Sequence, residues 1–241
     1  MDYRRAHADS PVCGASAVVS NVLYAMGGEV GHTLINVVEA YDPATDTWST
    51  KALLPMAMNS VYAVVDGGIV FTIGGYNDAS VRVPAVEIYN PATDQWTEGA
   101  PLNVGKSLAA VGVFGAEIIA AGGLTQSGDA TADNEGQRAG SQSWTTLALV
   151  PTARQGGCFE AVEGTLFLAG GNGSTFGPPP AVVEAYTRET NSWTTGLASM
   201  PYAAVVAASA SVAGCLYCFG GSDNANPYQG NIYNYVQIYQ P

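Results

Sequence analysis

Residues 37–50 read VVEAYDPATDTWST, and residues 85–98 read AVEIYNPATDQWTE, 48 positions later. In both stretches a short run with strand composition ends at a Tyr, Asp-Pro or Asn-Pro follows, and a Trp lies seven residues after the Tyr. Asp or Asn before Pro opens a turn, because the short side chain caps it and proline fixes φ. Each stretch therefore predicts a strand, a tight turn and a second strand beginning at Trp48 or Trp96.

Glycine pairs mark the same period along the whole chain. Their spacings are 47, 48, 48 and 50 residues, and the pairs are Gly27-Gly28, Gly74-Gly75, Gly122-Gly123, Gly170-Gly171 and Gly220-Gly221. An apolar run of strand length precedes each pair, and a polar loop follows it. Four short strands in a period of this length are typical of propeller blades. In the third copy Gln137 replaces the Tyr and Ala139 the Pro, which predicts a looser turn before Trp144.

The pattern GG…VExY(D/N)PxTxxW…P resembles the kelch repeat. The resemblance covers essentially the whole chain and implies an all-β, five-bladed kelch-type β-propeller with four antiparallel strands per blade. It also implies that the Tyr and Trp side chains pack between neighbouring blades. We expect one domain, residues 1–241, with blades near 9–54, 55–100, 101–150, 151–200, and 201–241 together with 1–8.

The fifth copy stops at Tyr239-Gln-Pro241, without its turn or its Trp strand. Tyr3 precedes Pro11 by eight residues, as Trp193 precedes Pro201. We therefore expect residues 1–8 to form the outer strand of the last blade and to close the ring, as kelch propellers commonly do. Six or seven blades are more usual in the family, so a complete small propeller and a fragment of a longer one both remain open.

Composition limits the classes of partner. The formal net charge is −12, which should repel nucleic acid and acidic membranes. No apolar run is long enough for a transmembrane helix and no signal peptide is visible, so the protein is expected to be soluble, with cytoplasm and secretion both open. Cys215 and Cys218 form a CxxC, but positions i and i+3 of a strand face opposite ways. Buried free thiols are expected rather than a metal or redox site.

The loops after the glycine pairs and the links after the prolines should share one face of the propeller. These segments vary, and variable loops on a rigid scaffold commonly carry binding sites. Each post-glycine loop offers an oxygen ligand, which predicts a possible Ca²⁺ site at the pore from Glu29, Asp78, Asp129, Asn172 and Asp223. The alternative is that these are ordinary polar loop residues.

Ligand contacts are expected on the same face. The candidates are Met58, Tyr76, Asn77, Arg154, Phe176, Tyr202 and Tyr228, because aromatic, amide and guanidinium groups suit protein or sugar ligands. Tyr233 and Tyr235 gather there too, or belong to the strand core. The positions three residues after the prolines are Met58, Val104, Arg154 and Ala204. Arg154 could contact an anion or pair with a nearby carboxylate. The repeated Glu39, Glu87, Glu135 and Glu184 suggest a structural role.

Two functions remain open from the sequence. The first is a binding module whose loop face takes a protein or a small polar or carbohydrate ligand, as the resemblance implies. The second is a small enzyme with its site at the pore, a Ca²⁺-dependent hydrolase or a sugar-modifying enzyme, since kelch relatives include epimerases and oxidases. GxSxG, HExxH and P-loop motifs are absent from the sequence.

Overall fold

A computed structural model describes residues 14–138, 140–173, 180–223 and 231–241. Within these ranges the chain contains strands and no helix, and hence no helix that could span a membrane. It divides into two compact units, Met1–Ser107 and Leu108–Pro241. The predicted strand of residues 1–8 lies outside the described residues.

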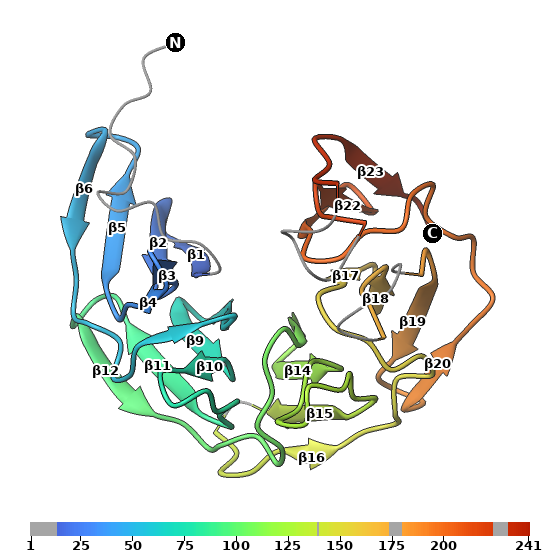
Figure 1. Cartoon of the computed structure of the whole chain (residues 1–241), viewed down its shortest axis with the longest axis horizontal. Helices are drawn as coiled ribbons and strands as arrows, with labels where there is room; N and C mark the ends of the chain where they lie inside the picture. The colour runs from blue at the N-terminus through green and yellow to red at the C-terminus, as the bar shows by residue number, and fades with distance from the viewer. Residues whose placement is uncertain (1–13, 139, 174–179, 224–230) are drawn as a thin grey trace. The chain divides into compact units, whose positions relative to one another are not determined.

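The first unit holds two four-stranded antiparallel sheets (Figure 1). The first sheet consists of β1 (Ala15–Val19), β2 (Val22–Met26), β5 (Val38–Asp42) and β6 (Thr47–Thr50). The second consists of β8 (Tyr62–Asp66), β9 (Ile69–Ile73), β11 (Val86–Asn90) and β12 (Gln95–Glu98). Two short pairs lie in the loops, β3 (Glu29–Val30) with β4 (Thr33–Leu34), and β7 (Met58–Asn59) with β10 (Tyr76–Asn77).

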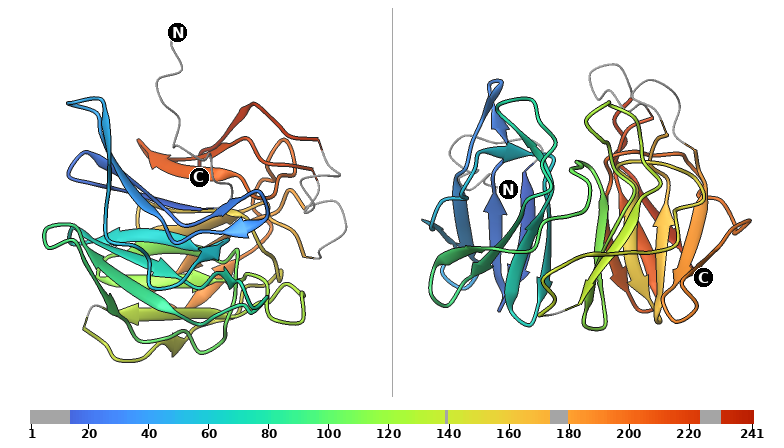
Figure 2. Two further views of the ribbon diagram at one scale, coloured as in Figure 1. Left: turned by 60° about the vertical axis from the view of Figure 1, so that its left-hand side comes forward. Right: turned by 90° about the horizontal axis from the view of Figure 1, so that it is seen from below.

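The second unit holds three more sheets, whose strands lie side by side in sequence order (Figure 2). The third sheet contains β13 (Ala110–Phe114), β14 (Glu117–Ala121), β15 (Asn134–Arg138) and β16 (Thr145–Thr146). The fourth contains β17 (Cys158–Val162), β18 (Thr165–Ala169), β19 (Val183–Thr187) and β20 (Ser192–Thr194). The fifth contains β21 (Ala208–Val212), β22 (Cys215–Phe219) and β23 (Val236–Tyr239). Each sheet is one blade, so the predicted all-β, five-bladed propeller class is confirmed.

Successive side chains of a strand point to opposite faces of its sheet, so apolar side chains at alternate positions pack against the neighbouring sheet. In β1, Ala15, Ala17 and Val19 are buried, and they share a core with Val70 and Tyr89 of the second sheet. The second unit repeats this arrangement with two further cores, one between the third and fourth sheets and one between the fourth and fifth. The hydrophobic core is therefore a series of layers between consecutive blades within each unit.

The opening motif forms the outer hairpin of each blade. Tyr89 pairs with Trp96 across β11 and β12, and the rings lie 4.8 Å apart. The indole Nε1 of Trp96 donates to the backbone oxygen of Ala52, in the preceding blade, at 2.9 Å. Trp193 makes the same bond to Ala148. The Tyr and Trp positions therefore join neighbouring blades, as the resemblance implied.

The third blade departs from the motif as predicted. Its outer strands pair over two residue pairs, against four in the second blade. Gln137 stands in the Tyr position and donates from Nε2 to the backbone oxygen of Ser141 at 3.0 Å. The shorter pairing agrees with the looser turn expected before Trp144.

The cysteines differ from the expectation of buried free thiols. Cys158 of β17 forms a disulfide with Cys218 of β22, although 60 residues separate them. The fourth and fifth blades stack on each other, which brings the two Cα atoms to 6.0 Å. Cys215 is a half-buried free thiol, and it faces away from Cys218 across the strand. The two cysteines of the CxxC are therefore not bonded to each other; Cys218 is in the disulfide with Cys158, and Cys215 is free.

One face of the fifth sheet is apolar and open in the described part of the chain. Alternate residues of β22 and β23 point to it, and their exposed fractions are 41% for Phe219, 51% for Val236 and 56% for Ile238. The equivalent face of the fourth sheet is buried under the fifth, in the core that includes Phe167, Val183 and Ala185. The fifth sheet has three described strands, and its expected fourth strand lies among the residues not described.

Candidate functional site

The loops of the predicted functional face begin at the glycine pairs, and the links after the prolines anchor them. The backbone amide of Gly123 donates to the oxygen of Arg154 at 2.9 Å, and that of Gly75 donates to the oxygen of Lys106 at 3.0 Å. The preceding glycine permits this approach, because a Cβ on Gly122 would lie 2.3 Å from the Arg154 oxygen. Its φ of +64° also suits glycine.

This anchoring corrects one of the predicted equivalent positions. The residues that accept from the second glycine of a pair are Met58, Lys106, Arg154 and Ala204. Lys106, five residues after Pro101, occupies the place predicted for Val104, three residues after that proline. The second link is two residues longer, so Val104 is 39% exposed and the Lys106 side chain is fully buried. Sequence reasoning missed Lys106; aligning the links on the next apolar run instead of on the proline would have found it.

Arg154 is buried in an ion pair, which is the alternative that the sequence left open. Its guanidinium Nη2 donates to Glu184 Oε2, and Nη1 donates to the backbone oxygens of Gly170 at 3.2 Å and Val182 at 3.1 Å. Burial lowers the pKa of Arg154, and the charge of Glu184 acts in the opposite direction. Because its side chain has no exposed surface, Arg154 supports the blade and presents no group to a ligand.

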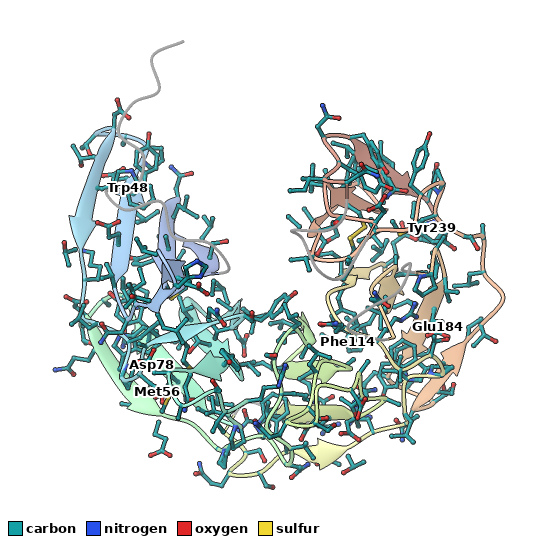
Figure 3. The ribbon with its side chains drawn as sticks, in the orientation of Figure 1. Trp48, Met56, Asp78, Phe114, Glu184 and Tyr239 are labelled. Carbon is teal, nitrogen blue, oxygen red and sulfur yellow. A yellow bond between two sulfur atoms is a disulfide. The ribbon has the colours of Figure 1, made fainter. Side chains whose placement is uncertain are left out.

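Glu184 shows what the repeated Glu position does. It lies on β19 (Figure 3), is 2% exposed, and accepts from Thr152 Oγ1 at 2.8 Å as well as from Arg154. In the fifth blade Gln237 holds the same place and accepts from the backbone amide of Tyr202 at 2.8 Å. The position therefore ties the middle strand of a blade to the link after the proline, as expected of a structural role.

In the first unit, Met58 is 1% exposed and belongs to the core. Tyr76 and Asn77 form β10, and Arg82 lies over the Tyr76 ring, 5.7 Å from its centroid. Asn77 Oδ1 accepts from the amides of Ala79 at 3.1 Å and Val81 at 3.0 Å. These contacts give Tyr76 and Asn77 a role in shaping their own loop; ligand binding by them stays a prediction.

The five predicted calcium ligands lie in both units. Glu29 accepts from Asn59 Nδ2 at 3.0 Å, and Asn172, 2% exposed, exchanges backbone hydrogen bonds with Gln155. Asp78, in the loop after β10 (Figure 3), and Asp129 are exposed. In the described ranges no three His, Cys, Asp or Glu side chains are grouped to hold a metal ion. The calcium site stays a prediction.

Asp223 belongs to the loop of the fifth blade. Its carboxylate accepts from the amide of Asn231 and from Asn231 Nδ2, both at 2.7 Å. These bonds lower the pKa of Asp223. The side chain is therefore a charged carboxylate at neutral pH.

Three tyrosine rings from two segments pack together in the same blade. The ring centroids of Tyr202 and Tyr235 are 4.8 Å apart, and those of Tyr235 and Tyr233 are 4.7 Å apart. β-Bridges join Val205 to Ser222 and Ser222 to Ile232, so the link after Pro201 lies beside the loop after Gly221. Phe176 and Tyr228, the other predicted aromatic contacts, lie outside the described residues.

We call this region the last-loop surface; Tyr202, Val206 and Ile232 are its exposed members, and Asp223 is half-buried beside them. The exposed fractions are 56% for Tyr202, 44% for Val206 and 74% for Ile232. Of these, Tyr202 and Asp223 were predicted as site residues, whereas Val206 and Ile232 were missed. An apolar residue in a loop resembles an apolar residue at a strand end, so the sequence carries no signal for their exposure.

Comparisons with known proteins find kelch motifs in the first part of the chain. The kelch motif model matches residues 11–52 and 63–103. Human Kelch-like protein 35 is 39% identical over 66 residues, which are 27% of this chain and 11% of that protein. Alpha-scruin from Limulus polyphemus is 32% identical over 69 residues, 28% of this chain and 7% of that protein. The matches thus span about a tenth of each relative's length.

Among solved structures, that of YjhT superposes with a TM-score of 0.83 over 96% of this chain and 82% of that chain. At 17% identity this likeness shows the shared fold. The matched motifs, the repeated Gly, Tyr and Trp positions and the blade topology together support a kelch-repeat family for this chain. The fold is an all-β propeller of five blades.

Proposed function

We propose that this kelch propeller is an interaction module that binds a protein ligand at the last-loop surface. The observation that carries the proposal is the joint exposure of Tyr202, Val206 and Ile232, which two adjacent segments hold together. Tyr is enriched at protein interfaces, because its ring is apolar and its hydroxyl can bond to a partner. Single exposed apolar residues are ordinary, but a group on loops of a rigid scaffold favours binding.

The blade beneath supports this role by holding the surface rigid. The Tyr202 amide donates to buried Gln237, and the Val206 amide donates to the backbone oxygen of Gly156 at 2.8 Å. Because these bonds order the segment before a ligand arrives, less conformational entropy is lost on binding. A protein ligand suits such a surface better than a polyanion, given the net charge of −12.

The test is a selection of peptides from a displayed library on the purified chain, followed by affinity measurement with variants. We expect Tyr202→Ser together with Ile232→Ser to weaken the selected peptides about tenfold or more, as loss of interface anchors does. The matched control is Leu149→Ser, since Leu149 is 58% exposed and lies on a different segment. Equal affinity for all variants would place the binding site elsewhere and contradict the proposal.

A further inference from the structure

A carboxylate lies at the junction between the fourth and fifth blades. Glu160 is on β17 between Cys158 and Val162, which are 2% and 3% exposed and belong to the core that these two blades share. Alternate side chains of a strand point to the same face, so Glu160 faces the fifth blade with them. The hydroxyl of Ser209, on β21, donates to Glu160 Oε1 at 3.0 Å. A titratable side chain therefore bridges the first strands of two blades.

The disulfide shows how close the two blades are at this point. It joins Cys158, two positions before Glu160, to Cys218. Cys218 is in turn the register partner of Ser209 across β21 and β22. The hydrogen bond between Ser209 and Glu160 is therefore the neighbour of the disulfide in the same contact. Because Glu160 is half-buried there, a change in its charge acts directly on the contact between the blades.

The strands packed against β17 bring no charged side chain to this carboxylate. They are β13, β18, β21 and β22, and the first three contain no titratable residue. In β22, Cys218 is in the disulfide, while Cys215 and Tyr217 point to the opposite face of the sheet. Glu163, in the turn after β17, is exposed. These strands therefore offer Glu160 a hydroxyl group and no cation.

This environment favours the protonated form of Glu160. Burial raises the pKa of the Glu160 carboxyl, and the hydrogen bond from Ser209 opposes this rise only in part. The folded protein therefore binds the proton more readily than the unfolded chain, so the proton stabilises the folded state. This stabilisation is complete below the ordinary Glu pKa of about 4.3 and is lost as the pH rises through the higher pKa of the folded protein.

We propose that Glu160 and Ser209 form a pH-dependent contact that holds the fifth blade on the fourth more firmly in mildly acidic than in neutral solution. The ionised carboxylate is costly in this place, because it lies beside an apolar core without a cation. The protonated carboxyl avoids this cost and keeps its bond to Ser209, since a hydroxyl both donates and accepts. The proposal concerns the junction of the blades and does not depend on what binds at the last-loop surface.

Hydrogen exchange at the amides of β21 and β22, followed by mass spectrometry from about pH 5 to about pH 8, tests the proposal. The wild type is compared with Glu160→Gln at each pH, so that the intrinsic pH dependence of exchange cancels. Gln keeps the size and the acceptor oxygen of Glu but carries no charge. We expect local opening of these strands to be about threefold or more rarer in the variant at the alkaline end. The difference should shrink toward the acidic end.

A carbon-13 NMR titration of the wild type measures the Glu160 pKa directly, with the signal assigned by its loss in Glu160→Gln. Ser209→Ala removes a donor to the ionised carboxylate, so the pKa of Glu160 should rise further. The pH at which exchange begins to change should rise with it, an effect that a purely structural role of Glu160 would not produce. Glu163→Gln is the matched control and should change neither measurement.

Two results would overturn the proposal. One is a Glu160 pKa at or below the ordinary value for Glu in the wild type. The other is equal exchange of the wild type and Glu160→Gln across the whole pH range, which would show that the charge of Glu160 has no influence on the junction.

Discussion

The hydroxyl of Tyr186 donates to Oδ1 of Asn191 at 2.8 Å, across the turn between β19 and β20. The same Oδ1 accepts from the backbone amide of Ala148, in the preceding blade, at 2.8 Å. In the second blade Asp94 binds Tyr89 and Ala52 in the same way. One side-chain oxygen thus closes a turn and joins two blades, which explains why the motif keeps Asp or Asn there.

Asn191→Ala should destabilise the protein by about 2–3 kcal/mol. The substitution removes both hydrogen bonds, leaves the hydroxyl of fully buried Tyr186 unpaired, and puts alanine at a φ of +48°. Urea unfolding measures the free energy. Asn191→Asp is the control, because it keeps Oδ1 and copies the second blade. An alanine variant within about 0.5 kcal/mol of the wild type would show that the bond is unimportant.

Asp94 should make stability depend on acid pH. Hydrogen bonds from the Ala52 amide and the Tyr89 hydroxyl lower the pKa of its carboxyl. The Asp94 carboxyl therefore binds a proton more readily in the unfolded chain than in the folded protein. Its contribution to the free energy of unfolding is complete above the ordinary Asp pKa of about 3.9 and is lost as the pH falls through the lower pKa of the folded state.

Melting temperatures of the wild type and Asp94→Asn, measured between about pH 6 and pH 2, check this expectation. The variant keeps the acceptor oxygen, as Asn191 does in the fourth blade, but has no charge to titrate. Its melting temperature should fall less steeply with acid than that of the wild type. Parallel curves would show that Asp94 makes no contribution to the acid transition.

The Cys158–Cys218 disulfide should stabilise the junction between the fourth and fifth blades. The two cysteines are 60 positions apart in the sequence. A disulfide across a loop of this length lowers the entropy of the unfolded chain and so stabilises the folded state by about 2–4 kcal/mol. We expect Cys158→Ser with Cys218→Ser, or a reducing agent, to lower the melting temperature. Cys215→Ser is the matched control and should change little. Peptide mapping without reduction identifies the pair, and a map with both cysteines free would contradict it.

Arg154→Ala should be strongly destabilising, by about 3–5 kcal/mol, because it leaves Glu184 buried without its cation. The fifth blade has uncharged residues at the two equivalent positions, Ala204 in place of Arg154 and Gln237 in place of Glu184. The double variant Arg154→Ala with Glu184→Gln copies that pair and should be more stable than Arg154→Ala alone. Denaturant unfolding of Arg154→Ala, Glu184→Gln and the double variant measures the interaction energy between the two side chains. Strictly additive changes in the free energy of unfolding would contradict this interaction.

Calcium binding by Glu29, Asp78, Asp129, Asn172 and Asp223 is a prediction from the sequence. A ligand that binds the folded state stabilises it by mass action. If the site exists, Ca²⁺ added after EDTA treatment should raise the melting temperature by several degrees, and Asp78→Asn should reduce the rise. Mg²⁺ at the same concentration is the control for ionic strength. An unchanged melt would contradict the calcium site.

Most of the fold could be predicted from short sequence patterns. The Asp-Pro or Asn-Pro turn, the Tyr and Trp on either side of it, and the glycine pair each act over a few residues, and all recur once per blade. Even the altered turn near Gln137 was readable, because its substitutions lie inside the repeat. For the candidate site the sequence pointed to the loops after the glycine pairs and the links after the prolines, and to Tyr202, which is exposed, and Asp223, which is half-buried.

The sequence by itself therefore determined the all-β class, the five blades and the order of strands within them, because hydrogen bonding between adjacent strands follows from short-range spacing. Tertiary structure alone decided which side chains meet between strands and between blades. It paired Cys158 with Cys218 and Arg154 with Glu184, and it placed Lys106 rather than Val104 under the second glycine pair. Such contacts depend on how sheets stack and on the length of each link, and residue spacing along the chain encodes neither.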